Sequence, residues 1–95
     1  MPTNLIVEPE LFDRDRITKS FAIGATLLEV HDPYMALQAV NAIAFDMVII
    51  AAEKQDEPGY AGLLSTVRHF MPHTRVLCVS TAAGGESTLY MGEGF

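Results

Sequence analysis

Short apolar runs alternate with longer segments of mixed polarity along the chain. The apolar runs cover residues 5–7, 26–30, 46–52 and 76–79, and each run predicts a strand. Residues 46–52 form the longest run, and its continuous apolarity is typical of a strand buried on both faces of a parallel sheet. Glu29 interrupts the run 26–30, so we expect this strand to lie near an edge of the sheet.

Three segments between these runs have helical patterns. Segment 11–23 has apolar and charged side chains at the spacing of an amphipathic helix, and Gly24 is a typical residue to close it. Asp32 followed by Pro33 predicts the start of a second helix, because Asp caps the first amides and proline suits the first helical position. Apolar side chains at positions 60, 63, 64 and 67 predict a third helix that ends near residue 70.

Strands that alternate with helices predict a single α/β domain over residues 1–95, with a doubly wound parallel sheet in three layers. In such sheets the functional site lies beyond the carboxyl ends of the strands, here residues 8–10, 31–32, 51–56 and 80–81. Residues 86–95 are short and weakly patterned, so we expect the sheet to be truncated after the fourth strand. The fourth strand would then have an unpaired apolar edge, unless another chain covers it or residues 86–95, although short, fold back onto it.

Charge and cysteine content indicate which cellular compartment and which classes of partner to expect. The chain has 12 Asp and Glu against 6 Lys and Arg, and this net charge of −6 argues against direct nucleic-acid binding and against docking on anionic lipid. A single cysteine, Cys78, forms no intrachain disulfide and suits the reducing cytoplasm. No apolar run approaches the roughly 20 residues of a membrane helix. We therefore expect a cytoplasmic protein whose partner is the basic surface of another protein or a divalent cation.

The ends of the predicted strands carry a recognisable pattern. Residues 4–10 read NLIVEPE and end in an acidic cluster, and residues 45–51 read FDMVIIA. Gly59 opens the third helix, and the fourth strand ends in Ser80 and Thr81. This order and spacing over residues 4–82 resembles the receiver domain of bacterial two-component response regulators, of the chemotaxis-regulator type. The resemblance implies a flavodoxin-like fold.

The resemblance also shows which parts of receiver chemistry are missing. The phosphoacceptor aspartate of a receiver corresponds to Ala51, and a methyl group cannot attack phosphorus. Of the acidic pair that holds Mg²⁺ in receivers, Glu8 remains, but its neighbour is Pro9, which has no ligand atom. The receiver lysine would fall beyond Phe95. Mg²⁺ prefers octahedral oxygen coordination, so we expect no cofactor, with Glu8 as a weak metal candidate.

Three candidate roles remain open at these strand ends. Glu8 and Glu10 are either a residual cation site or a polar loop. Glu53 either mimics an activated state near the missing phosphoryl group or is an exposed acid in a loop with other acids. Ser80, which corresponds to the switch hydroxyl of a receiver, either reports conformation or bonds its own backbone. In each case the simpler interpretation is favoured. Glu8, Glu10 and Glu53 together form a predicted acidic pocket.

The expected function is that of a pseudo-receiver: a non-enzymatic signalling domain that acts by phosphorylation-independent protein–protein interaction or dimerisation. Its partner would be a signalling protein or a fused output domain. The unpaired fourth strand and the apolar tail favour a homo-oligomer. The alternative is a small-ligand sensor that binds at the carboxyl ends of the strands. No G-x-S-x-G motif, paired catalytic carboxylates or Cys–His arrangement supports an enzyme.

Overall fold

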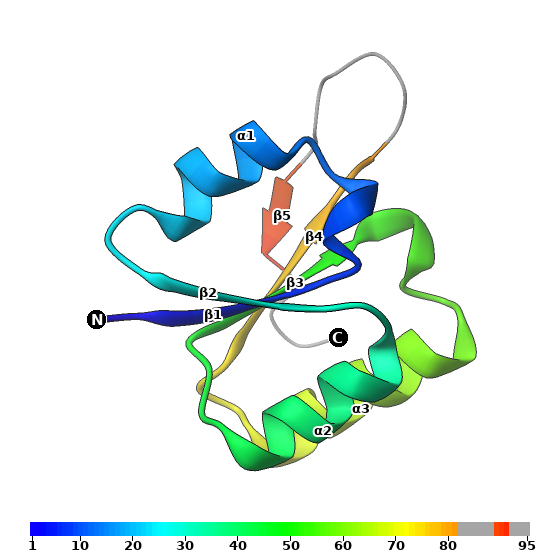
Figure 1. Cartoon of the computed structure of the whole chain (residues 1–95). Coiled ribbons are helices and arrows are strands. Elements are labelled where there is room, and N and C mark those ends of the chain that lie inside the picture. Colours follow the sequence, from blue (N-terminus) through cyan, green and yellow to red (C-terminus); the bar gives the residue numbers. More distant parts are fainter. Residues whose placement is uncertain (82–88, 92–95) are drawn as a thin grey trace.

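The computed structural model describes residues 1–81 and 89–91. Its sheet has the strand order β2-β1-β3-β4-β5 (Figure 1). The first four strands are β1 (Thr3–Val7), β2 (Thr26–Val30), β3 (Met47–Ala51) and β4 (Arg75–Val79), and they run parallel. All four predicted strands are confirmed within a residue or two of their bounds. The chain has an α/β, flavodoxin-like fold.

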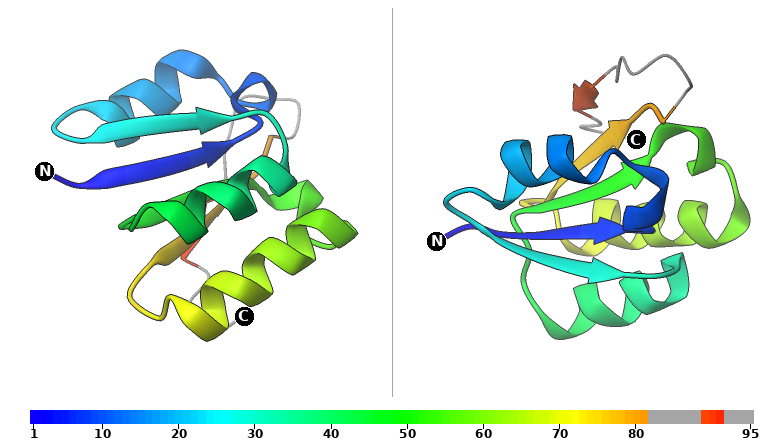
Figure 2. Two further views of the ribbon diagram at one scale, coloured as in Figure 1. Left: turned by 60° about the horizontal axis from the view of Figure 1, so that its bottom comes forward. Right: turned by 45° about the horizontal axis from the view of Figure 1, so that its top comes forward.

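Helices cover both faces of the sheet and make three layers (Figure 2). On one face lie α2 (Pro33–Ala42) and α3 (Pro58–Phe70), and on the other lies α1 (Arg14–Ile17). The predicted cap of α2 is confirmed, because the Asp32 carboxylate accepts a hydrogen bond from the Met35 amide at 2.8 Å. Among the described helices, none has both the length and the apolarity to cross a membrane.

Side chains that alternate along each strand fill two separate cores. Val48 and Ile50 of β3 point into the larger core, between the sheet and the pair α2 and α3. Ile49, between them in sequence, points into the smaller core beside α1. All three are fully buried, which explains why β3 reads as a continuous apolar run.

The first helical segment differs from the single helix expected over residues 11–23. A 3-10 turn, η1 (Pro9–Leu11), comes first, and α1 starts only after Asp13, whose side chain accepts hydrogen bonds from the amides of Asp15 and Arg16. A π-helical segment, η2 (Thr18–Ala22), follows. The prediction of one regular helix is therefore wrong. The predicted closing residue is confirmed, since Gly24 has a φ of 75° that favours glycine.

The fourth strand is not an open edge of the sheet. A short strand, β5 (Leu89–Met91), pairs antiparallel with β4, with Cys78 opposite Tyr90. The parallel part of the sheet ends at β4, as expected. Its outer side is not left unpaired, because β5 folds back onto it, which was the less favoured alternative for so short a segment. The two strands are consecutive in the sequence, but the three residues of β5 are too few to form a pattern that predicts a strand. The edge strands of the sheet are therefore β2 and the short β5.

Candidate functional site

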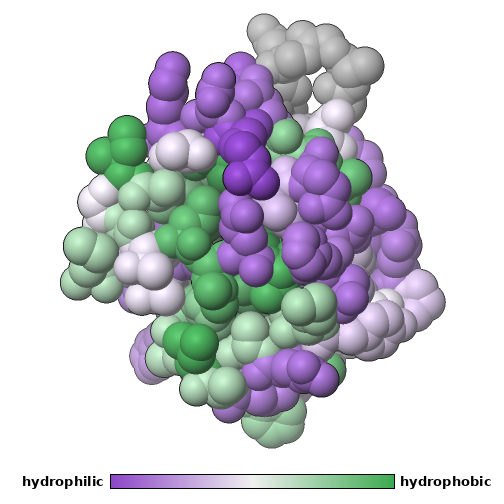
Figure 3. Space-filling view, viewed as in Figure 1, coloured by the Kyte–Doolittle hydropathy of each residue, from purple (hydrophilic) through white to green (hydrophobic). Residues whose placement is uncertain are grey.

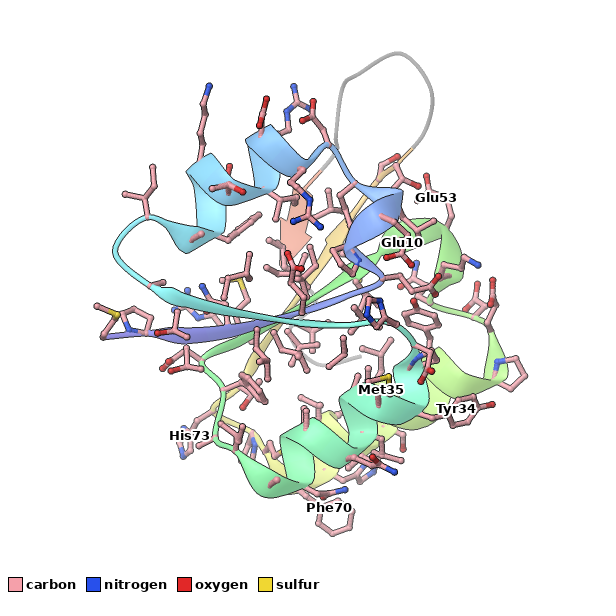
Figure 4. The ribbon with its side chains drawn as sticks, viewed as in Figure 1. Glu10, Tyr34, Met35, Glu53, Phe70 and His73 are labelled. Atoms are coloured by element: carbon pink, nitrogen blue, oxygen red, sulfur yellow. The ribbon has the colours of Figure 1, made fainter. Side chains whose placement is uncertain are left out.

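The carboxyl ends of β1, β3 and β4 bring the predicted site residues to one end of the sheet. Parallel pairing places Ala51 of β3 beside Val79 of β4, and the loops after these strands carry Glu53 and Ser80. Figure 4 shows Glu10 and Glu53 at this same end, in the segments that follow β1 and β3. The location predicted from strand ends is therefore where these side chains gather.

Ala51 is the last residue of β3 and is fully buried. A 3-10 turn, η3 (Ala52–Lys54), follows directly and turns the chain away from the sheet. The side chain at position 51 is a methyl group, so no nucleophile lies at the end of the central strand. Any chemistry at this end must come from the neighbouring carboxylates and hydroxyls.

Glu8, which follows the last residue of β1, has an unusual backbone conformation. Its φ is 56°, a left-handed value that is uncommon for a residue with a side chain. The Tyr60 hydroxyl, at the start of α3, donates a hydrogen bond to the Glu8 carboxylate. The Tyr60 ring is buried, and burial together with Glu8 raises the pKa of its hydroxyl far above the usual value. Tyr60 therefore remains a hydrogen-bond donor at any physiological pH.

Two of the predicted acids, Glu8 and Glu10, lie close enough to Tyr60 to affect the pKa of its hydroxyl. Glu10 is exposed in η1, and it acts with Glu8 and Glu57 to raise the pKa of the Tyr60 hydroxyl. The neighbouring Pro9 is buried and has no ligand atom. Among the residues described, no three His, Cys, Asp or Glu side chains lie in an arrangement that holds a metal ion. The donors at the receiver-like positions, one engaged carboxylate, a proline and a methyl group, do not fit octahedral Mg²⁺.

The Glu53 carboxylate makes the densest set of contacts at this end of the sheet. It accepts hydrogen bonds from the Ser80 hydroxyl at 3.1 Å, from the Thr81 amide at 3.0 Å and from the Thr81 hydroxyl at 3.0 Å. The Thr81 amide is the main cause of a lowered pKa for Glu53, and the two hydroxyls add to it. We call this set the Glu53 contact.

The Glu53 contact joins the loop after β3 to the end of β4. Glu53 is solvent-exposed, as expected of a loop acid, but its carboxylate is held in a defined position. The Ser80 hydroxyl is directed to another loop rather than only to its own backbone. The predicted acidic pocket is thus divided, with Glu8 and Glu10 near Tyr60 and Glu53 bound to Ser80 and Thr81.

Sequence reasoning missed Tyr60 and Thr81 as partners of these acids. The spacing of Tyr60 predicts only its place on the apolar face of a helix, although a buried tyrosine hydroxyl usually has a polar partner.

The structure also explains why glycine suits position 59. A methyl group at position 59 would lie 2.8 Å from the Pro33 ring of α2, so α2 and α3 approach closely here.

A groove of 540 Å³ lies at the opposite, amino ends of the strands, where no site was predicted. Phe21, Ile23 and Met47 supply apolar walls, and Arg75 and His73 supply basic groups. Neither basic side chain forms a hydrogen bond or ion pair with another described residue. The groove was missed because its lining comes from chain segments that are far apart in sequence.

Comparisons with protein-family models, with curated protein sequences and with solved structures find no match to this chain.

Proposed function

We propose that this chain is a pseudo-receiver, a cytoplasmic signalling domain that works through protein–protein contacts or dimerisation without accepting a phosphoryl group. The strand order β2-β1-β3-β4 with helices on both faces is compatible with a receiver scaffold. The buried methyl group of Ala51, where a receiver has its phosphoacceptor, supports the loss of phosphorylation.

The Glu53 contact is the observation that carries the proposal. In a receiver, the hydroxyl at the end of the fourth strand binds oxygens of the phosphoryl group. Here the corresponding hydroxyl, that of Ser80, donates to a carboxylate that is a permanent part of the chain. A carboxylate and a phosphoryl group are both anionic acceptors, so Glu53 supplies continuously the interaction that phosphorylation supplies on demand. The proposed domain therefore has one fixed arrangement of this loop.

Charge indicates which surface meets a partner. Seven charged side chains lie in the segments 8–11, 31–32 and 52–57, which directly follow β1, β2 and β3, and only Lys54 among them is basic. The others are Glu8, Glu10, Asp32, Glu53, Asp56 and Glu57. An acidic edge of this kind favours a protein partner with a basic surface, because complementary charge steers association. The partner would be a signalling protein or an output domain of the same polypeptide.

Incubation with acetyl phosphate and Mg²⁺, followed by intact-mass measurement, tests the proposal. A functional receiver treated in parallel verifies that the phosphodonor is active. We expect no change in the mass of this chain. A stoichiometric, Mg²⁺-dependent gain of one phosphoryl group would overturn the proposal.

The groove at the amino ends favours a second candidate function, small-ligand sensing. Basic side chains beside apolar walls suit an organic anion, and the one carboxylate of the lining, that of Asp46, accepts a hydrogen bond from the Thr3 amide. This proposed site differs from the one expected at the carboxyl ends of the strands. A thermal-shift screen of small carboxylates and phosphates, repeated with Arg75→Gln, tests it. Stabilisation of the wild type that is lost in the variant would support ligand sensing, and no shift with any anion would remove it.

A further inference from the structure

The two edges of the sheet are protected to different degrees. One edge is the three-residue strand β5, which covers the outer side of β4, and the other is the five-residue strand β2, which pairs only with β1. Both views in Figure 2 place β2 along the border of the sheet. Its five residues are in continuous register with β1, from Thr26 opposite Thr3 to Val30 opposite Val7. The strand is therefore regular along its whole length.

Natural sheets usually protect such an edge with proline, a bulge or charged side chains. The sequence of β2, TLLEV, contains no proline, and its register shows no bulge. Its one charged side chain is Glu29, and Arg14 of α1 lies 3.4 Å from the Glu29 carboxylate. Because the Arg14 guanidinium offsets this charge, the edge has no net charge of its own to repel another strand.

The backbone geometry leaves donors and acceptors free at regular positions. The Thr26 amide donates to Pro2 and the Val30 carbonyl accepts from Glu8, so the backbone groups of residues 26, 28 and 30 point toward β1. Those of Leu27 and Glu29 consequently point outward. An antiparallel partner strand forms hydrogen bonds with alternate residues of its neighbour. Leu27 and Glu29, one on each side of Leu28, offer their backbone groups in this way.

The same edge has an uncovered apolar surface. Leu28 is 37% exposed, and it lies on the face of the sheet that α2 covers. Met35 of α2 is 43% exposed, and Ile43, which caps the end of this helix, is 47% exposed. Figure 3 shows apolar surface gathered over β2 and the adjoining part of α2. Burial of these side chains would add to the hydrogen bonds of a new strand pair.

We propose that two copies of this chain pair through β2, antiparallel and centred on Leu28, to form one continuous sheet. The inference rests on the proposed function and specifies the surface through which dimerisation occurs. In this pairing Leu27 of each copy exchanges backbone hydrogen bonds with Glu29 of the other, and the two Leu28 side chains meet on the two-fold axis.

A second copy suits this edge because the edge is neutral, apolar on one face and able to pair with itself. A two-fold interface brings the same surface together twice, so the surface must be self-complementary. Each copy contributes one Glu29 and one Arg14 to the α1 side of this edge. Because Arg14 of each copy already offsets the charge of its own Glu29, the two edges can meet without net repulsion. On the α2 side, Leu28, Met35 and Ile43 meet their own apolar counterparts.

Sedimentation of the wild type and two lysine variants tests the surface. Leu28→Lys places a charge at the centre of the proposed pairing, whereas Phe70→Lys changes a 77% exposed apolar residue at the end of α3, away from β2. We expect dimers for the wild type and for Phe70→Lys. For Leu28→Lys we expect dimerisation weakened by at least about tenfold, because a central lysine opposes edge pairing. A monomeric wild type, or an unaffected Leu28→Lys dimer, would overturn the inference.

Leu28→Cys gives a second readout that does not depend on the lysine variant folding. Residues that meet in a non-hydrogen-bonded antiparallel pair have Cα atoms about 4.5 Å apart, within the range of a disulfide. We expect mild oxidation to link Leu28→Cys into covalent dimers, and the wild type, whose single Cys78 is buried, to remain unlinked. Absence of covalent dimers from Leu28→Cys would contradict pairing centred on this residue. A monomeric chain that still does not accept a phosphoryl group would refute this inference and leave the proposed function standing.

Discussion

The close approach of α2 and α3 at Gly59 allows us to predict how a side chain at this position changes the free energy of unfolding. A methyl group added at position 59 would lie 2.8 Å from Cγ of Pro33 and 3.2 Å from the Tyr34 ring. Carbon atoms in ordinary contact lie about 3.5–4.0 Å apart, so one helix must shift to admit the methyl group. Gly62 lies one turn later in the same helix, and a methyl group there meets nothing within 4 Å. The two glycines therefore form a matched pair.

The size of the effect follows from two opposing contributions. Replacing a helical glycine with alanine stabilises by roughly 0.5–1 kcal/mol, because alanine loses less backbone entropy on folding. Overpacking of a filled interface destabilises by roughly 1–3 kcal/mol. We expect Gly62→Ala to be more stable than the wild type. Gly59→Ala should be less stable than Gly62→Ala by the overpacking contribution, roughly 1–3 kcal/mol.

Urea denaturation followed by far-UV circular dichroism measures both variants against the wild type. Thermal unfolding gives an independent value, since about 1 kcal/mol corresponds to a shift of roughly 4–8 °C in a domain of this size. Equal stability of Gly59→Ala and Gly62→Ala would refute the proposed close approach of α2 and α3. Such a result would mean that α2 and α3 leave room for a side chain at position 59.

Three further predictions concern single side chains. Tyr60→Phe removes the hydrogen bond to Glu8 and should lower the free energy of unfolding by roughly 1.5–3 kcal/mol in urea denaturation, whereas an unchanged value would contradict that bond. The pKa of Glu53 is lowered in the folded state, below its ordinary value of 4.5, so its stabilising contribution is present above that value and is lost as pH falls through the lowered pKa. Denaturation midpoints of the wild type should therefore fall more steeply on acidification than those of Glu53→Gln, and parallel curves would refute the Glu53 contact. Burial raises the pKa of the Cys78 thiol, so a thiol reagent should modify it slowly in the native protein and rapidly in urea, and fast native labelling would contradict its position in β4.

The sequence was most informative where local chemistry determines structure. Burial on both faces requires a continuous apolar run, and this made β3 and β4 predictable. The Asp32 side chain and Pro33 mark the start of α2 through local capping, and Gly24 marks a left-handed turn. The single polar interruption at Glu29 correctly indicated an edge strand. These signals act within a few residues, so a single sequence contains them.

Features that depend on distant contacts were not predictable in the same way. The Tyr60 hydroxyl reaches Glu8 across 52 positions, and the Glu53 carboxylate reaches Thr81 across 28. Both contacts depend on how the loops turn at the ends of the strands, including the left-handed backbone at Glu8. The pairing of β5 with β4 likewise depends on tertiary structure, because a three-residue strand has little preference of its own.

The most direct test of the account is a comparison of amide NMR spectra with and without Mg²⁺ and beryllofluoride, an analogue of the phosphoryl group. We predict that the resonances of Ala51, Ser80 and Thr81 in the wild type do not respond to the analogue. Glu53→Ala should shift the Ser80 and Thr81 resonances, whereas Asp56→Ala, which removes an exposed acid from the same loop, should leave them in place. A beryllofluoride-dependent shift of the wild-type resonances at these strand ends would contradict the claim that Glu53 has replaced the phosphoryl group.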